Sequence, residues 1–446
     1  MKHLMITPPA PVQTALDTLC GAGFDAYIVG GCVRDSLRGA EPHDWDCTTN
    51  AKPDEISACF HDFHVIETGL QHGTVTVVID HIPIEITTYR IDGVYADHRR
   101  PDTVTFTDSL TDDLARRDFT VNAMAYHPER GLIDPYHGAA DLQVETIRCV
   151  GSPHDRFEED GLRILRAMRF ASVLDFAIAE DTAKAVHTQK MLLRHISAER
   201  IDTELTKLLC GVGAERVLTE FADVLFTVLP ELAPMQGFEQ HNPHHDYDVY
   251  THTLKAVAAC PPEPILRWAA LLHDTGKPHT FTQDDRGGHF YGHAAVSKEI
   301  ARRALKAMKC DRKRLDRVLL LVEKHDLVMN GTEKQLKRVV RQIGDEAATQ
   351  LLLLHRADVS AQAACHRAER VEEADRLLQM LEALRAADAC MSLKQLAVTG
   401  GDLLAAGMPQ GKTIGDALNR LLEAVIEGEL PNEHDVLLHA ALSDLT

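Results

Sequence analysis

The amino-acid sequence predicts an α+β fold, in which a mixed α/β head is followed by a chain that is helical to its end. Within residues 1–150, short apolar strands alternate with helical stretches. From Phe157 onward, apolar residues recur instead at i, i+3 and i+4, the spacing of amphipathic helices. No apolar stretch reaches the ~18 residues that a membrane helix needs, so we expect no membrane span.

The head is predicted to begin with a helix over residues 10–21, followed by the strand FDAYIVGG, which ends in a pair of glycines. Residues 74–90 alternate apolar and polar side chains around a central turn, and this pattern predicts a β-hairpin. A strand-like segment, TIRCVG, lies near the end of the head at residues 146–151.

The rest of the chain is divided by prolines that cluster between residues 230 and 264. Helical periodicity is clear in EEDGLRILRAMRFASVL, ERIDTELTKLL, PILRWAALLHD, RKRLDRVLLLVEKH and KQLKRVVRQI. We therefore expect four parts: a head over 1–150, a helical neck over 151–230, a helical domain over 231–362 and a helical tail over 363–446.

The chain is acidic, with 47 Lys and Arg against 67 Asp and Glu and a formal net charge of −20. This balance argues against nucleic-acid binding over the whole surface, but it permits a local basic stripe. The ten cysteines form no CxxC pair, so a zinc knuckle or a redox motif has no support. Scattered thiols, and a start without a secretory-signal pattern, lead us to expect a cytoplasmic protein.

The glycine pair Gly30–Gly31 follows an apolar strand and precedes a predicted helix that carries Arg34. Glycines at such a turn let backbone N–H groups approach a phosphate closely, and Arg34 would add a charged donor. The alternative is a tight turn with a surface arginine.

Asp44 and Asp46 follow ten residues later, on either side of Trp45. If this segment is a strand, both carboxylates share one face. Carboxylate oxygens are the ligands that Mg²⁺ prefers and shares with substrate phosphates. Glu85, in the predicted hairpin, is a candidate third carboxylate. A solvated strand edge is the alternative for all three.

Two further polar clusters follow. In RRDFTVNA, Arg117, Asp118 and Asn122 are suited to triphosphate oxygens and ribose hydroxyls, or they form a charged helix start. In EEDGLRILRAMRF, a helix would place Asp160 beside Arg163, and such a pair can hydrogen-bond a base edge. The alternative there is a surface ion pair. Two arginines, Arg166 and Arg169, continue the row.

These segments, in this order and together with DPYHGAADL, resemble the class II tRNA nucleotidyltransferases, which comprise the CCA-adding enzymes and the related bacterial poly(A) polymerases. The resemblance covers residues 24–215, and TGGDLLAAGMPQGKTIGDALNRLLEAV resembles the C-terminal region of the same family. It implies a head of the DNA polymerase beta type that acts on the tRNA 3′ end, with CTP and ATP as substrates and Mg²⁺ as cofactor.

Carried over residue by residue, the resemblance implies that Asp44 and Asp46 bind two catalytic metal ions. Asp160 and Arg163 would pair with the base as a protein template, and Gly161 departs from the Ala or Pro that is common in relatives. The implied nucleotide site comprises Gly31, Arg34, Arg117, Asp118, Asn122, Glu159, Asp160, Arg163, Arg166 and Arg169.

The same motifs serve several activities. A poly(A) polymerase, or an enzyme that adds only CC or only A, would carry them too. A regulatory protein with a degenerate head is a rival from another class, but its mark would be loss of the paired aspartates or of the basic residues, and neither is lost.

Histidines and aspartates on successive predicted helices form a second constellation. Imidazole and carboxylate groups of a helical bundle can converge on a divalent metal, although each isolated histidine could equally be a surface or capping residue. The set resembles the HD phosphohydrolases, which implies a transition-metal site and a phosphohydrolase activity. The implied ligands are His252, His273, Asp274 and Asp358, with His293 and His325 as candidates for a second metal.

Two locally basic segments, residues 312–314 and 334–341, lie on predicted helices. They could follow tRNA phosphates or form a solvated helical face.

Overall fold

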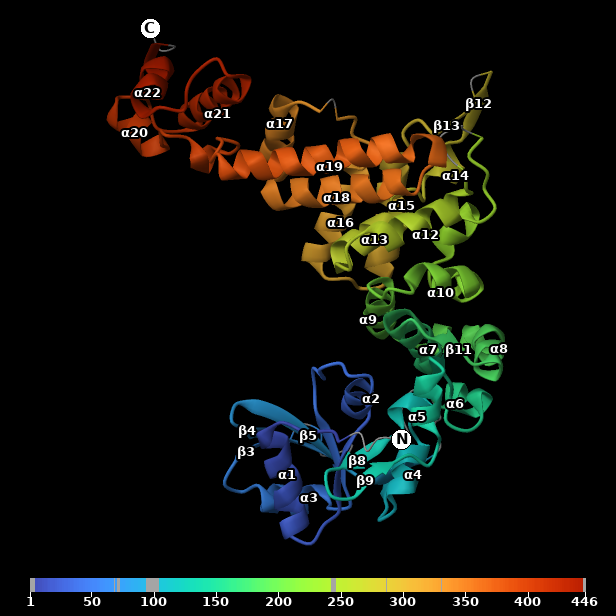
Figure 1. Ribbon diagram of the computed structural model, residues 1–446. Coiled ribbons are helices and arrows are strands. Elements are labelled where there is room, and N and C mark those ends of the chain that lie inside the picture. Colours follow the sequence, from blue (N-terminus) through green and yellow to red (C-terminus); the bar gives the residue numbers. More distant parts are fainter. Residues whose placement is uncertain are drawn as a thin grey trace. The chain divides into compact units, whose positions relative to one another are not determined.

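The computed structural model describes residues 5–67, 69, 73–93, 104–241, 246–285, 287–329 and 331–443. The chain divides into two compact units, Met1–Pro230 and Glu231–Thr446. The first unit contains a mixed sheet and helices, and the second is built almost entirely of helices (Figure 1). The predicted α+β class, with a mixed sheet in the head and a helical remainder, is confirmed.

Among the described residues, a seven-stranded sheet in the order β3-β4-β5-β2-β1-β8-β9 organises the head. β2 and β5 pair in parallel, and the other neighbours are antiparallel. The predicted hairpin is present as β4 and β5. The strands are β1 (Ala26–Val29), β2 (Asp46–Thr49), β3 (His64–Ile66), β4 (Thr74–Ile79), β5 (Ile82–Thr88), β8 (Ala125–His127) and β9 (Gly131–Ile133).

Strand β1 is buried on both faces, because its alternate side chains enter two different cores. Ile28 joins the core that the sheet forms with three of the helices, whereas Tyr27 and Val29 pack with Tyr89 and Leu114 on the other side. The glycine turn after β1 is thereby fixed in place. The head helices are α1 (Ala10–Gly21), α2 (Gly31–Leu37), α3 (Pro53–Cys59), α4 (Leu110–Ala115) and α5 (Gly138–Gln143).

Short strand pairs complete the first unit. β6 (Arg90–Asp92) pairs with β7 (Val104–Phe106), and β10 (Thr146–Ile147) pairs in parallel with β11 (Ala177–Ile178). A 3-10 turn, η2 (Thr120–Asn122), precedes β8.

The helical neck follows the sheet, and its helix α7 is central, packing against α9, α10, α6 and α8. The helix predicted within residues 158–174 is present from Leu162 to Leu174, but it does not include Asp160, because the chain leaves the helical conformation there (φ −139°, ψ 104°). The Asp160 carboxylate accepts a hydrogen bond from the Leu162 N–H (3.0 Å) and so starts a new helix. The helices are α6 (Pro153–Glu159), α7 (Leu162–Leu174), α8 (Glu180–Gln189), α9 (Ala198–Leu209), α10 (Ala214–Glu220) and α11 (Ala222–Val228), with 3-10 helices η3 (Lys190–His195) and η4 (Pro230–Met235).

In the second unit, α12 packs against α13 and α18, and both of these also pack against α16. Trp268 of α13 is fully buried in this bundle. The elements are α12 (Val249–Ala259), α13 (Pro264–Leu272), α14 (Lys277–Thr280), β12 (Thr282–Asp284), β13 (Gly287–His289), α15 (His293–Ala307), α16 (Arg312–Lys324), α17 (Glu333–Ile343), α18 (Asp345–Ser360), α19 (Ala364–Ala386), η5 (Leu393–Gln395), α20 (Gly400–Ala405), α21 (Lys412–Glu427) and α22 (His434–Ser443).

The basic segment of α17 is paired within the chain. Lys334 and Arg338 form ion pairs with Glu427 of α21, and Arg338 and Arg341 form ion pairs with Glu423. These charges therefore bind the tail helix instead of forming an unpaired basic stripe.

Across the described part of the chain, no helix is both long enough and apolar enough to cross a lipid bilayer.

The contact between α7 and the end of α9 leaves no room for a side chain at Gly211. A Cβ there would lie 2.2 Å from the Ser172 Oγ and 2.6 Å from its carbonyl carbon. We expect Gly211→Ala to destabilise the protein by about 2 kcal/mol, because the packed backbones must separate. Gly21→Ala is the control, because a Cβ at the end of α1 meets nothing within 4 Å. Urea unfolding followed by circular dichroism measures both; equal stability of the two variants would contradict the close packing.

Candidate nucleotide and metal sites

Three carboxylates gather at one rim of the head sheet. β2 and β5 run in parallel with Asp46 directly opposite Glu85, as expected for a third carboxylate near the pair. β2 begins at Asp46, so the prediction that one strand carries both aspartates is wrong, and Asp44 lies in the irregular segment before it. Trp45 packs against the head core, which leaves the flanking aspartates on the solvent side.

The electrostatics of this rim favour a bound cation. Asp46 reaches solvent, yet partial desolvation by the surrounding protein, followed by repulsion from Glu85 and Asp44, raises its pKa to about 6. Arg117 opposes this shift. A divalent cation would relieve the repulsion, and an exposed rim leaves room for substrate phosphates to share it.

Beside the rim, the glycine turn faces two arginines. Gly30 has a φ of +81°, which favours glycine, and a Cβ there would lie 3.1 Å from an Arg117 terminal nitrogen. Gly31 begins α2, as expected, and Arg34 follows one turn later. Arg34 donates to Asp35 (2.8 Å) and to the Asn122 side-chain oxygen (2.7 Å).

Asp118 joins this group to the neck. Its carboxylate accepts hydrogen bonds from the Asn122 amide (3.2 Å) and from Arg166 of α7 (2.8 and 2.5 Å). Burial alone would raise the pKa of Asp118, but Arg166 and Arg163 overcome it and lower that pKa to about 2. The carboxylate is therefore charged, and it fixes Arg166 beside the glycine turn.

Three guanidinium groups surround one aromatic ring. The Cζ atoms of Arg34, Arg166 and Arg169 lie 5.3, 5.4 and 3.8 Å from the Phe170 ring centre. The ring face and neighbouring carboxylates stabilise these like charges at such short separations. Three guanidinium groups held close together can bind the negative charges of a polyphosphate. The structure thus brings together the predicted phosphate-binding residues.

The two residues expected to recognise the base are held by different partners. Arg163 is buried and donates to Glu159 (2.6 Å) and to the Arg116 carbonyl (3.0 Å). Asp160 lies before α7 rather than on it, so the predicted helical i, i+3 arrangement is wrong. Its carboxylate accepts instead from Arg200 of α9 (2.7 Å).

Sequence reasoning did not single out several residues that support this site. Asp113 is fully buried and binds Arg116 (2.7 Å) and Arg117 (3.5 Å). Its position three and four residues before those arginines was a usable signal. Arg200 carried no comparable signal, because its partner Asp160 lies 40 positions away in the sequence. Phe170 carried none, because the arginines beside it contact only the face of its ring.

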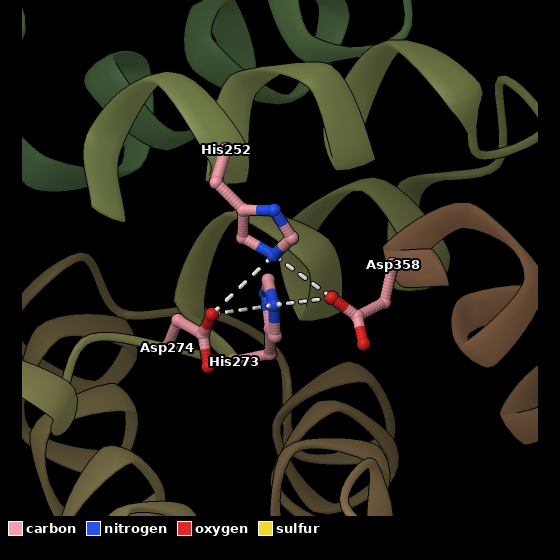
Figure 2. A group of neighbouring side chains, drawn as sticks. All are labelled: His252, His273, Asp274 and Asp358. Atoms are coloured by element: carbon pink, nitrogen blue, oxygen red, sulfur yellow. Dashed lines mark hydrogen bonds and ion pairs between the residues drawn. The ribbon is translucent and has the colours of Figure 1, made fainter. Parts of the chain in front are cut away.

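In the second unit, four side chains converge on one point (Figure 2). His252 comes from α12, His273 and Asp274 follow α13, and Asp358 comes from α18. One ligand atom of each lies within 4.8 Å of all the others. The His252 Nε2 lies 2.8 Å from Asp358 and 3.5 Å from Asp274, and the His273 Nε2 lies 3.1 Å from Asp274.

A second group shares Asp274. The Nε2 atoms of His293, which begins α15, and His325, which ends α16, are 3.1 Å apart. They lie 3.4 and 3.6 Å from the Asp274 Oδ1. The structure therefore brings together all six residues predicted for this region.

The backbone fixes the tautomers of these histidines. The Nδ1 atoms of His273, His293 and His325 lie 2.7, 2.8 and 2.7 Å from backbone carbonyl oxygens. A carbonyl oxygen only accepts, so each Nδ1 carries a proton and each Nε2 is directed to the centre. This is the arrangement by which proteins orient metal-binding imidazoles.

The cluster also fits a cation electrostatically. The His273 Nε2 and both Asp274 carboxylate oxygens are buried and lack a hydrogen bond of good geometry. The Lys277 Nζ lies 2.6 Å from the Asp274 Oδ2 as an ion pair. Burial alone would lower the pKa of His273, but Asp274 and Asp358 raise it to about 10. A divalent cation would replace that proton and satisfy the orphaned atoms.

Comparison with known families matches three parts of the chain. Residues 26–148 match the Poly A polymerase head domain, and residues 175–235 match the "Probable RNA and SrmB- binding site of polymerase A". Residues 290–441 match the tRNA nucleotidyltransferase domain 2.

Full-length relatives agree with these matches. The chain is 35% identical to the CCA-adding enzyme of Levilactobacillus brevis over 432 residues, which cover 97% of each chain. It is 34% identical over 421 residues to the CCA-adding enzyme of Enterococcus faecalis, covering 94% of this chain and 92% of the relative.

Among solved structures, the chain is similar to the Bacillus stearothermophilus CCA-adding enzyme in complex with CTP, with a TM-score of 0.73, 31% identity and 98% coverage of each chain. The Thermotoga maritima CCA-adding enzyme complexed with tRNA shares the fold, with a TM-score of 0.60 at 19% identity. By its motifs, its sequence relatives and its fold, the chain belongs to the family of CCA-adding enzymes, which are tRNA nucleotidyltransferases.

Proposed function

We propose that this protein adds CMP and AMP, taken from CTP and ATP, to the 3′ end of tRNA in the cytoplasm. The observation that carries the proposal is the convergence, in one unit, of the carboxylate rim, the glycine turn and the arginine group around Phe170. Relatives that are named CCA-adding enzymes, among them one with bound CTP, support the same activity.

The head of this family implies the use of a divalent metal, and we assign Mg²⁺ to Asp44 and Asp46, with Glu85 beside them. When bound there, the metal ions would lower the pKa of the tRNA 3′-hydroxyl and would stabilise the departing pyrophosphate. Arg34 and Arg117, at the glycine turn, bind the triphosphate and orient its α-phosphate for attack by that hydroxyl.

We assign base selection to Asp160 and Arg163. A carboxylate accepts from the exocyclic amine that cytosine and adenine share, and a guanidinium donates to the adjacent ring nitrogen. Uracil and guanine carry a carbonyl oxygen in place of that amine, which the carboxylate repels. Glu159 supports the selection because it holds Arg163 in position.

The alternatives within this enzyme class are a poly(A) polymerase and an enzyme that adds only CC or only A. Extension of tRNAs that end before, within and after CCA, with single nucleotides, separates them. A regulatory protein with a degenerate head is disfavoured, because both aspartates and all the arginines of the site are present.

A second activity is favoured by the cluster around Asp274. We propose that His252, His273, Asp274 and Asp358 would hold one divalent transition metal, and that Asp274, His293 and His325 would hold a second. Such a centre supplies an activated water for hydrolysis of a phosphate ester, as the resemblance to HD phosphohydrolases implies. A pocket of about 320 Å³, lined by Lys277 among others, opens beside it.

The metal assignment in the head predicts that Asp44→Ala or Asp46→Ala reduces nucleotide addition about a thousandfold, because several kcal/mol of charge stabilisation are lost. The measurement is extension of tRNA lacking CCA, with thermal unfolding to show that the variant is folded. Asp17→Ala removes an exposed carboxylate of α1 and serves as the control. If the double variant of Asp44→Ala and Asp46→Ala keeps more than a few per cent of wild-type turnover, the metal assignment is wrong.

The base-selection assignment predicts that Arg163→Ala loses discrimination for CTP and ATP over UTP and GTP by about tenfold to a hundredfold, the cost of a lost hydrogen bond from a charged group. Arg117→Ala should weaken all four nucleotides alike. Steady-state kinetics with each nucleotide provide the comparison. A uniform loss in Arg163→Ala would mean that this arginine only supports the site.

The two centres use different ligands, so we expect them to be separable. The double variant of His273→Ala and Asp274→Ala should lose tightly bound transition metal and any phosphatase activity, while tRNA extension falls less than about threefold. His279→Ala, an exposed histidine of α14, is the control. Elemental analysis and both assays are performed on one preparation. Loss of extension as severe as in Asp46→Ala, in a folded protein, would show that the two sites act as one.

A further inference from the structure

The carboxylate of Asp160 is held in place by a helix of the neck. Arg200, in the first turn of α9, donates to both of its oxygens, at 2.7 and 3.4 Å. The Leu162 N–H occupies one further acceptor position, at 3.0 Å from Oδ1. A carboxylate offers about four acceptor positions, so one remains available to a base.

Helix α9 carries a second contact of opposite charge one turn later. Glu204 is buried, and its carboxylate lies 2.7 Å from the Arg169 Nε and 3.8 Å from an Arg166 nitrogen. The first of these contacts is an ion pair without the geometry of a hydrogen bond. Arg200 and Glu204 thus place a positive and a negative charge of α9 against complementary charges of the nucleotide site.

Asp160 needs such a partner because no helix orients it. It lies in the non-helical step between α6 and α7, where its backbone is extended. A short side chain in such a step rotates freely unless it is bound from both sides, and a two-bond contact from a guanidinium fixes the plane of the carboxylate. Arg163, by contrast, lies within a helix and is buried.

We propose that Arg200 is a positioning residue for nucleotide selection, which orients the Asp160 carboxylate that recognises the exocyclic amine of the incoming base. The inference rests on the proposed role of Asp160 in base recognition. Arg200 itself does not touch the nucleotide. Its side chain is 28% exposed, so its removal leaves the neck core in place.

The fold keeps Arg200 at the right distance. The end of α9 meets α7 where Ser172 donates to the Leu208 carbonyl (2.7 Å) and the Gly213 N–H donates to the Ser172 carbonyl (2.9 Å). With this end fixed, α9 extends along α7, and its first turn meets Asp160. The packing of α9 against α7 therefore fixes the position of Arg200, and Arg200 in turn fixes the orientation of the Asp160 carboxylate.

The test compares Arg200→Ala, Arg200→Lys and the control Lys207→Ala, which removes the exposed lysine in the last turn of the same helix. We expect Arg200→Ala to raise the KM for CTP and ATP and to increase UTP and GTP incorporation relative to CTP about tenfold, the effect of losing a charged hydrogen bond. Arg200→Lys should restore part of the selectivity, because an ammonium group keeps the charge but not the two-bond geometry. Lys207→Ala should keep wild-type selectivity.

The double variant of Asp160→Ala and Arg200→Ala distinguishes this inference from the proposed function. If Arg200 acts through Asp160, its substitution has no further effect on selectivity once Asp160 is alanine. If Asp160→Ala loses selectivity and Arg200→Ala does not, the inference is wrong while the function stands. If Asp160→Ala itself leaves selectivity unchanged, the base-recognition role is wrong. Additive effects in the double variant would show that Arg200 acts independently, which also overturns the inference.

Discussion

The ion pair between the buried carboxylate of Asp118 and the partly exposed Arg166 is the interaction on which the proposed nucleotide site depends. Asp118 belongs to the head and Arg166 to the neck helix α7, so their contact joins the glycine turn to the segment to which we assign base recognition. Asp118 also accepts from Asn122, which in turn accepts from Arg34. A single buried carboxylate thereby fixes the relative positions of residues that are distant in the sequence. Such a charge is stable only because several donors surround it.

Much of this arrangement follows from local sequence pattern. The alternation in residues 74–90 predicted the hairpin, and the glycine pair predicted the start of α2, because both depend on neighbouring residues alone. The order of the motifs predicted the family, and the resemblance to HD phosphohydrolases implied which histidines and aspartates meet around Asp274. The finer division of the chain into head, neck, HD-type domain and tail stays a prediction.

Other features could not be predicted because they depend on tertiary contacts. The helical period around Asp160 is continuous in the sequence, but its side chain binds a backbone N–H and Arg200, and this breaks the helix. The basic segment of α17 has the composition of a phosphate-binding stripe, yet it pairs with acidic residues of α21. In each case the partner lies far along the chain, where periodicity carries no information.

The parallel pairing of β2 and β5 has a consequence for how the enzyme becomes active during folding. β4 and β5 are neighbours in the sequence and form a local hairpin, whereas Asp46 and Glu85 are 39 positions apart (85 − 46) and meet only when β2 pairs beside β5. Non-local pairing of this kind forms later than a hairpin because a longer loop must close first. The carboxylate rim is therefore assembled late, and a nascent or partly folded chain lacks the metal site that we assign to this rim until the central sheet is complete.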